Sequence, residues 1–123
     1  MAGKTKVSQQ ASDAAAVFFD ALGERGHEPA LEYVTGSVAF ELANGRGRRR
    51  WRVDVRKGDV AVSRAAGPAD CTFRAGEDVF RKIITGRSSP MTAVLRGEVA
   101  VEGDPRMLLL FRRLLPTPGR RRR

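Results

Sequence analysis

The sequence predicts an α+β fold, with helices packed on one face of a five-stranded, mostly antiparallel sheet. Two observations support this fold class. Apolar residues recur with a period near 3.6 at the start and towards the end of the chain, and with a period of two between these regions. Clusters of Gly, Pro, Asn and Asp separate the segments, as is typical of turns. The predicted order is one helix, four strands, two helices, one strand and one helix.

The first predicted helix begins at Asp13. Ser12 can cap it, because a side-chain oxygen at that position accepts a hydrogen bond from a free backbone N–H. Gly23 and Gly26 are expected to end the helix, and Pro29 favours a further helical turn up to residue 33. The apolar residues recur as on one helix face, which predicts a core-facing stripe of Ala14, Val17, Phe18, Ala21 and Leu22.

Residues 37–56 predict two strands joined in a hairpin. From Ser37 apolar residues alternate with others, and Asn44-Gly45 supplies the chemistry of a tight turn. One face of each strand is therefore expected in the core and the other in solvent. On the returning strand the two sets are Trp51, Val53 and Val55 against Arg50, Arg52, Asp54 and Arg56.

Two further turns predict two more strands. Residues 57–59 lead into a strand over 60–62, and residues 65–68 lead into a strand over 70–74. A meander, in which each strand pairs with the next, is the simplest arrangement of the four.

Helical periodicity returns after residue 76. A helix is predicted over 77–86, because acidic residues in its first turn complement the helix dipole and its apolar residues form one stripe. Ser89 is expected to cap a shorter helix that stops at Gly97. A strand follows over 98–102, and Pro105 opens the last helix.

The last predicted helix, residues 105–115, has a wide apolar surface. Residues 107–111 are five consecutive apolar residues, so their side chains point around more than half of the helix. This pattern fits a helix wedged between the sheet and another helix. It also fits a cavity wall that meets protein on one side and a ligand on the other. From the residues alone, both interpretations stay open.

The formal charge of +9 is concentrated in two places. Five arginines lie between Arg46 and Arg52, and four form the end of the chain, Arg120–Arg123. The other 14 basic residues equal the 14 acidic residues in number. The body of the chain is therefore expected to be neutral, with two basic additions.

No residue pattern predicts catalysis, a metal site or a cofactor. His27 is the one histidine and has no second ligand nearby in the sequence, so an exposed loop position is expected. Ser89 is explained as a helix cap and does not lie in a nucleophile elbow. Cys71 alternates with Phe73, which places its thiol on the buried face of a strand as a small core residue. We therefore expect a protein that is not an enzyme.

The chain is expected to act in the cytoplasm as one domain. A single cysteine favours a reducing compartment, and the sequence shows neither a signal peptide nor an apolar run long enough to span a membrane. The predicted organisation is a flexible start over residues 1–10, one domain over residues 11–115 and a disordered basic tail over residues 116–123.

Several segments together resemble the sterol carrier protein-2 family. Residues 51–58 look like the family's tryptophan strand and turn, and residues 69–73 like the strand that follows. A helix ending at residues 85–87 and a strand between two glycines at residues 97–104 complete the match, which covers residues 31–115. The resemblance implies an apolar lipid-binding tunnel between the sheet and the helices.

The family resemblance favours the cavity interpretation of the last helix. A cavity needs additional apolar surface on the helices that cover the sheet, and methionines suit it because their side chains adapt to different ligand shapes. By this analogy the floor of the cavity is formed by Phe40 and Trp51, and its walls by Phe80, Ile83, Ile84, Met91, Leu95, Met107, Leu110, Phe111 and Leu114.

The first functional hypothesis is a non-catalytic carrier of a sterol, fatty acyl or isoprenoid-like lipid, which it delivers to a membrane or an enzyme. Its arginines would then contact anionic lipid headgroups. These candidate contacts are Arg46, Arg48, Arg49, Arg50, Arg120, Arg121, Arg122 and Arg123.

Other hypotheses use the same residues differently. In a nucleic-acid-binding module the arginines would contact phosphates and Trp51 would stack on a base, although Trp51 shares its predicted face with Val53 and Val55. The basic stretches also fit a solubilising surface. A third hypothesis is a homodimer or a partner for an enzyme.

Overall fold

The computed structural model describes residues 13–113 and 115, and it describes the side chains of all of these except residues 108–111. The predicted flexible start, the Ser12 cap and the basic tail with Arg120–Arg123 lie outside the described residues. So do the side chains of Leu110, Phe111 and Leu114.

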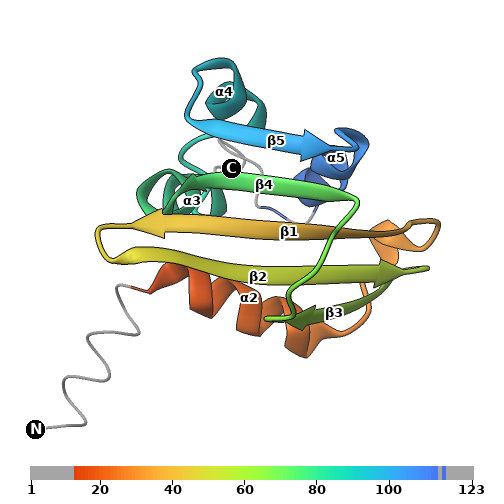
Figure 1. The fold of residues 1–123 in the computed structure, drawn as a ribbon. Helices are drawn as coiled ribbons and strands as arrows, with labels where there is room; N and C mark the ends of the chain where they lie inside the picture. The colour runs from red at the N-terminus through yellow and green to blue at the C-terminus, as the bar shows by residue number, and fades with distance from the viewer. Residues whose placement is uncertain (1–12, 114, 116–123) are drawn as a thin grey trace, which may run out of the picture.

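A five-stranded sheet forms the centre of the fold (Figure 1). Its strands are β1 (Thr35–Asn44), β2 (Gly47–Arg56), β3 (Asp59–Ser63), β4 (Cys71–Gly76) and β5 (Val99–Gly103), in the spatial order β3-β2-β1-β4-β5. The pair β1–β4 is parallel and the other three pairs are antiparallel. The predicted mostly antiparallel sheet is therefore confirmed.

The predicted four-strand meander is wrong beyond β3. Residues 64–70 do not return beside β3 but cross the outer face of the sheet and place β4 next to β1 (Figure 1). Seven extended residues reach roughly 23 Å, which is more than the ~14 Å across three strand spacings. The crossing is held down by Arg50 and Arg52, which donate hydrogen bonds to the backbone oxygens of Gly67 and Pro68.

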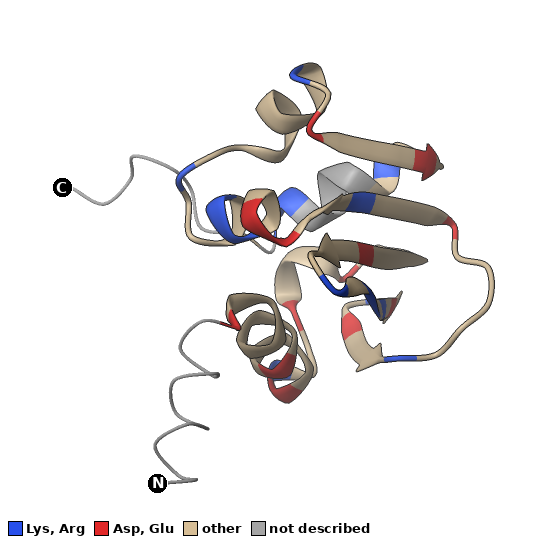
Figure 2. Cartoon of the chain, turned by 60° about the vertical axis from the view of Figure 1, so that its left-hand side comes forward, with Lys and Arg blue, Asp and Glu red and all other residues tan. Residues whose placement is uncertain are grey.

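The helices are α2 (Ala14–Arg25), the 3₁₀ turn η1 (Pro29–Leu31), α3 (Glu77–Ile84), α4 (Pro90–Leu95) and α5 (Arg106–Arg113). Helices α2 and α3 lie on the other face of the sheet, as the side view shows (Figure 2), and α4 packs beside the edge strand β5. Ser89 caps α4 as predicted, because its hydroxyl accepts a hydrogen bond from the Thr92 N–H at 3.0 Å. The cap of α2 is Asp13, whose carboxylate accepts from the Ala16 N–H at 3.2 Å.

The buried face of α2 is shifted by one position from the predicted stripe, and Leu22 alone is common to both. Ala15, Phe19 and Leu22 are buried, whereas Val17 is 52% exposed. The sequence is compatible with either helix face, because the alanines and the adjacent residues Phe18 and Phe19 provide an apolar stripe in both registers. Packing of Phe19 against the sheet selects the face.

An aromatic cluster fills the space between the sheet and helices α2 and α3. Phe19 stacks on Trp51 with ring centroids 4.8 Å apart and on Phe80 at 5.5 Å. Phe40 lies 5.1 Å from Phe19, and Phe73 lies 5.4 Å from Phe40. All five rings are buried. Such pairs add to the free energy that apolar burial provides, so this part of the interlayer space is a packed core.

Candidate functional site

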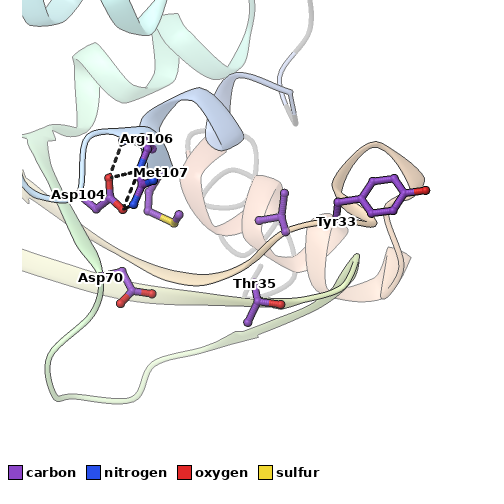
Figure 3. Close-up of a pocket in the computed structure, with 7 residues that line it drawn as sticks. Tyr33, Thr35, Asp70, Asp104, Arg106 and Met107 are labelled. Carbon is purple, nitrogen blue, oxygen red and sulfur yellow. Dashed lines mark hydrogen bonds and ion pairs between the residues drawn. The ribbon is translucent and has the colours of Figure 1, made fainter.

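A pocket of about 440 Å³ opens at one end of the sheet (Figure 3). It lies where the segment between η1 and β1, the residue before β4 and the turn from β5 into α5 meet. Several of its lining residues are exposed, so the pocket is open to solvent. The lining residues are Tyr33, Val34, Thr35, Asp70, Asp104, Arg106 and Met107.

Met107 forms the apolar wall of the pocket. It lies in the first turn of α5, and its backbone N–H donates to the Asp104 oxygen at 3.1 Å. Its side chain packs against the core and reaches over Gly36 on β1. A Cβ atom at Gly36 would lie 2.8 Å from the Met107 Sδ atom, which is closer than real Cβ atoms come. The absence of a side chain at Gly36 therefore makes room for the thioether.

Asp70 forms the polar wall. Its Oδ2 atom accepts hydrogen bonds from the backbone N–H of Ser37 at 2.9 Å and from the Ser37 hydroxyl at 3.4 Å. In return, the Ser37 hydroxyl accepts from the Asp70 N–H at 3.0 Å. These reciprocal bonds fix the carboxylate at the start of β4, with Ser37 buried beneath it.

The turn between β5 and α5 is attached to the same point. The Asp104 N–H donates to the Asp70 backbone oxygen at 2.8 Å. Gly103 has φ +95°, and a Cβ atom there would lie 2.3 Å from that oxygen. Only glycine combines this backbone conformation with so close an approach. The pocket thus depends on a contact between residues that lie far apart in the sequence.

The two carboxylates of the pocket differ in charge compensation. The Arg106 side chain donates to both oxygens of Asp104, and these hydrogen bonds hold the pKa of Asp104 below its usual value. None of the ion pairs formed among the described residues includes Asp70. The mouth of the pocket therefore carries one neutralised ion pair and one uncompensated negative charge beside an apolar wall. This combination suits a ligand with an apolar body and a hydrogen-bond donor at one end.

Cys71 is 1% exposed and follows Asp70 directly. Burial raises the pKa of its thiol, with smaller contributions from Asp104 and Asp70. The thiol therefore stays protonated at neutral pH and is a poor nucleophile. The prediction that Cys71 is a small core residue on the same face as Phe73 is confirmed.

The residues predicted to line a cavity fall into three groups. Phe40, Trp51, Phe80 and Ile83 are buried in the packed core, and Ile84 is partly buried against it. Met107 lines the pocket. Met91 and Leu95, on α4, are 40% and 81% exposed.

Most pocket residues were not predicted from the sequence. Tyr33 lies at the end of a predicted helical turn, Asp70 at the start of a predicted strand and Arg106 in the first turn of the last predicted helix. Thr35 lies outside the predicted elements. A signal was present in Gly103-Asp104, where a glycine next to a carboxylate ends a strand, but the sequence alone does not reveal what approaches it.

The arginines of the β1–β2 hairpin do not form one free basic surface. Arg49 points to the helix face, where it donates to Asp13 at 2.7 Å and to Glu77 at 2.8 Å. These bonds raise the pKa of Arg49 and lower that of Asp13. Arg50 pairs with Glu41 on the outer face at 3.1 Å. Arg46 and Arg48 are exposed and take part in none of the ion pairs among the described residues.

Trp51 is not available to stack on a base. It is 4% exposed, with Phe19 stacked on its ring. The guanidinium groups of Arg49 and Arg64 lie 4.7 and 4.4 Å from the ring centroid. The buried ring of Trp51 therefore gives no support to the hypothesis of a nucleic-acid-binding module.

Two further findings concern the described part of the chain. It contains no cluster of three or more His, Cys, Asp or Glu side chains arranged to hold a metal ion. No helix within it has the length and apolar character that crossing a bilayer requires.

The fold and the pocket define a small α+β binding domain with a mixed sheet covered by helices on one face. Residues 19–116 match the model of the SCP-2 sterol transfer family. The chain belongs to this family, and the resemblance found in the sequence is confirmed.

The relatives of the chain agree with this assignment. Sterol carrier protein 2 from Gallus gallus is 32% identical over 103 residues, which make up 80% of this chain and 18% of that relative. The chain thus spans less than a fifth of the length of that curated relative.

Two solved structures share the fold. The crystal structure of sterol carrier protein 2 like 2 from Aedes aegypti has a TM-score of 0.65 at 16% identity and covers 82% of this chain and 95% of that one. A solution structure of palmitated SCP2L2 from the same organism has a TM-score of 0.56 at 19% identity, with 83% and 87% coverage.

Proposed function

We propose that this chain binds an apolar lipid and carries it without catalysing a reaction. The observation that carries the proposal is the pocket in which the Met107 side chain, over Gly36, faces the Asp70 carboxylate. Membership of the sterol transfer family supports the ligand class. The palmitated SCP2L2 protein of Aedes aegypti supports an acyl chain among the ligands.

In this proposal the apolar body of the ligand enters along Met107 and Val34 and continues beneath α5. The aromatic cluster fills the space between the sheet and helices α2 and α3. The ligand therefore lies between α5 and β1 and does not extend along the whole space between the sheet and the helices. In this proposal Leu110, Phe111 and Leu114 line the cavity, whereas the exposed residues Met91 and Leu95 do not.

The polar end of the ligand lies at the mouth of the pocket. A hydroxyl group can donate to Asp70, whose second carboxylate oxygen is not used by Ser37. A ligand carboxylate would meet the negative charge of Asp70 instead. A neutral, hydroxyl-bearing lipid is therefore favoured over a fatty acid anion.

The proposed absence of catalysis is supported by the chemistry of the pocket. The thiol nearest to it belongs to Cys71, which is buried and protonated. Asp104 is held in an ion pair with Arg106, which keeps its carboxylate ionised and unsuited to donate a proton at neutral pH.

The test is native mass spectrometry of the purified protein, followed by extraction and identification of the molecules that co-purify. A stoichiometric lipid, or saturable uptake of a fluorescent sterol or fatty acid by the stripped protein, is the expected result. An apo mass together with no uptake of either probe would overturn the proposal.

A further inference from the structure

Helix α4 presents two large apolar side chains to solvent. Met91 is 40% exposed and Leu95 is 81% exposed, and their spacing of four residues places them on the same face of the helix. The other two large exposed hydrophobic residues in the described part of the chain, Val17 and Tyr33, lie singly on α2 and after η1. Scattered apolar residues need no explanation, but an adjacent pair on one helix face does.

The opposite face of α4 is fixed. Pro90 and Ala93 are buried, and the helix packs beside β5 at the edge of the sheet (Figure 1). The Ser89 cap begins the helix, and the Gly97 N–H donates to the Val94 oxygen at 3.0 Å where it ends. Met91 and Leu95 therefore stay outward because the inner face is already packed.

Uncompensated positive charge flanks this apolar pair. Arg87 precedes α4 and Arg96 is its C-cap, and both are exposed. Neither forms an ion pair with a carboxylate in the described part of the chain, whereas Arg49, Arg50 and Arg74 are all paired. The nearest acidic residue in the sequence is Glu98, so the segment 87–98 is positive overall.

We propose that α4, with Met91 and Leu95 between Arg87 and Arg96, is the surface by which this protein docks on an anionic membrane. Interfacial helices bind in this way, with apolar side chains in the headgroup region and basic side chains on anionic lipids. Two apolar side chains are too few for a stable protein interface, which buries about 800 Å² on each partner. Reversible attachment to a lipid surface needs less.

The docking surface is connected to the pocket. β5 begins just after α4 and ends at Gly103, which fixes the turn that carries Asp104 and Met107. A protein docked through α4 thus has one continuous strand between the membrane and the ligand. A role of this docking in ligand delivery rests on the proposed lipid carriage, but the docking itself can be measured without a ligand.

The experiment measures partitioning of the full chain onto two kinds of vesicles, phosphatidylcholine alone and phosphatidylcholine mixed with phosphatidylserine. Three variants are compared with the wild type: M91S/L95S, R87Q/R96Q, and the control R46Q/R48Q. The control removes the same charge from exposed arginines at the hairpin tip, where no large apolar side chain is exposed.

We expect M91S/L95S and R87Q/R96Q each to lose more than tenfold in partitioning onto the mixed vesicles. Each basic residue contributes a factor of about five, and burial of the two apolar side chains in the headgroup region contributes at least as much. R46Q/R48Q should lose less than either. Wild-type partitioning by M91S/L95S, or an equal loss in R46Q/R48Q and R87Q/R96Q, would overturn the proposal. Thermal unfolding of each variant shows whether it is folded, as expected for exposed positions.

Probe uptake by the wild type in the same preparation separates the two proposals. Docking without uptake would overturn lipid carriage and leave the α4 surface in place. Uptake without docking on either vesicle would overturn the α4 surface and leave carriage in place.

Discussion

The Sδ atom of Met107 occupies the place next to Gly36 that a side chain would need, since a Cβ atom there would lie only 2.8 Å away. Gly36 is extended and not in the left-handed region, so its role is spatial rather than conformational. The glycine sets the width of the pocket, and the flexible thioether sets its wall.

Replacing Gly36 with Ala should narrow the pocket. The new methyl group pushes Met107 away from β1 and into the cavity, and it also lies 3.2 Å from the Asp70 carboxylate. We expect the affinity for an apolar fluorescent probe to fall about tenfold, with a loss of about 1 kcal/mol in the free energy of unfolding. Gly45→Ala is the control, because a Cβ atom at Gly45 meets nothing within 4 Å. Equal affinities for the two variants would contradict this role of Gly36.

Replacing Gly103 with Ala should destabilise the turn beneath the pocket. The alanine has to adopt φ +95°, and its Cβ atom would lie 2.3 Å from the Asp70 backbone oxygen. Gly97→Ala separates the backbone strain from the steric clash, since Gly97 also has a positive φ of +76° but a Cβ atom there would meet nothing within 4 Å. We expect Gly97→Ala to cost about 1 kcal/mol from the backbone conformation alone, and Gly103→Ala roughly 2 kcal/mol more. Urea unfolding measures both, and a similar loss in the two would argue against a tight contact at Gly103.

The bridge formed by Arg49 should make stability depend on pH. The pKa of Asp13 is lowered in the folded protein, chiefly by the hydrogen bonds from Arg49. Because the unfolded chain binds a proton more readily, the bridge stabilises the protein above the ordinary pKa of 3.8, and this contribution is lost as the pH falls below it.

Arg49→Met should therefore lower the free energy of unfolding at pH 7 by about 1 to 2 kcal/mol and weaken its decline between pH 5 and pH 3. The methionine keeps an apolar stem beside Trp51. Arg81→Met is the control, because Arg81 and Asp78 form an exposed pair that should contribute less than about 0.5 kcal/mol. An unchanged slope of stability against pH in Arg49→Met would contradict the assignment to Asp13.

Asp70 should determine which polar ends the pocket accepts. Asp70→Asn removes the negative charge and keeps an oxygen that can accept from Ser37. We expect the affinity for a carboxylate-bearing probe to rise about fivefold relative to a hydroxyl-bearing one, from roughly 1 kcal/mol of charge repulsion. Asp59→Asn, on the edge strand β3 beside His27 and outside the pocket lining, should not change the ratio. A ratio unchanged in Asp70→Asn would exclude the carboxylate as a selector.

Local signals in the sequence predicted the elements well. The turn at Lys57-Gly58, with φ of 49° and 89°, joins β2 and β3 as expected from its composition. Ser89 caps α4 because its hydroxyl oxygen accepts a hydrogen bond from a backbone N–H of the first helical turn. Such features depend on neighbours in the chain, so alternation and turn residues are sufficient to find them.

Features that depend on distant partners were not found. The alternation of Cys71 and Phe73 gives the buried face of β4 but not its neighbour, which is β1 rather than β3. The pocket has the same origin, because Asp70 and Asp104 meet only when Cys71 pairs with Gly103 across β4 and β5. No period in a single sequence encodes such a pairing.

The strand order divides the sheet into a half with local strand pairing and a half with long-range strand pairing. β1, β2 and β3 follow one another through short turns, so their contacts are local and close quickly. The parallel pair of β1 and β4 joins residues that are 33 apart, as Ser37 and Asp70 show, and β5 can add only to β4. We expect the hairpins to form early and the half of the sheet that bears the pocket to form late. The ligand site is then the last part of the protein to be completed and the first to open.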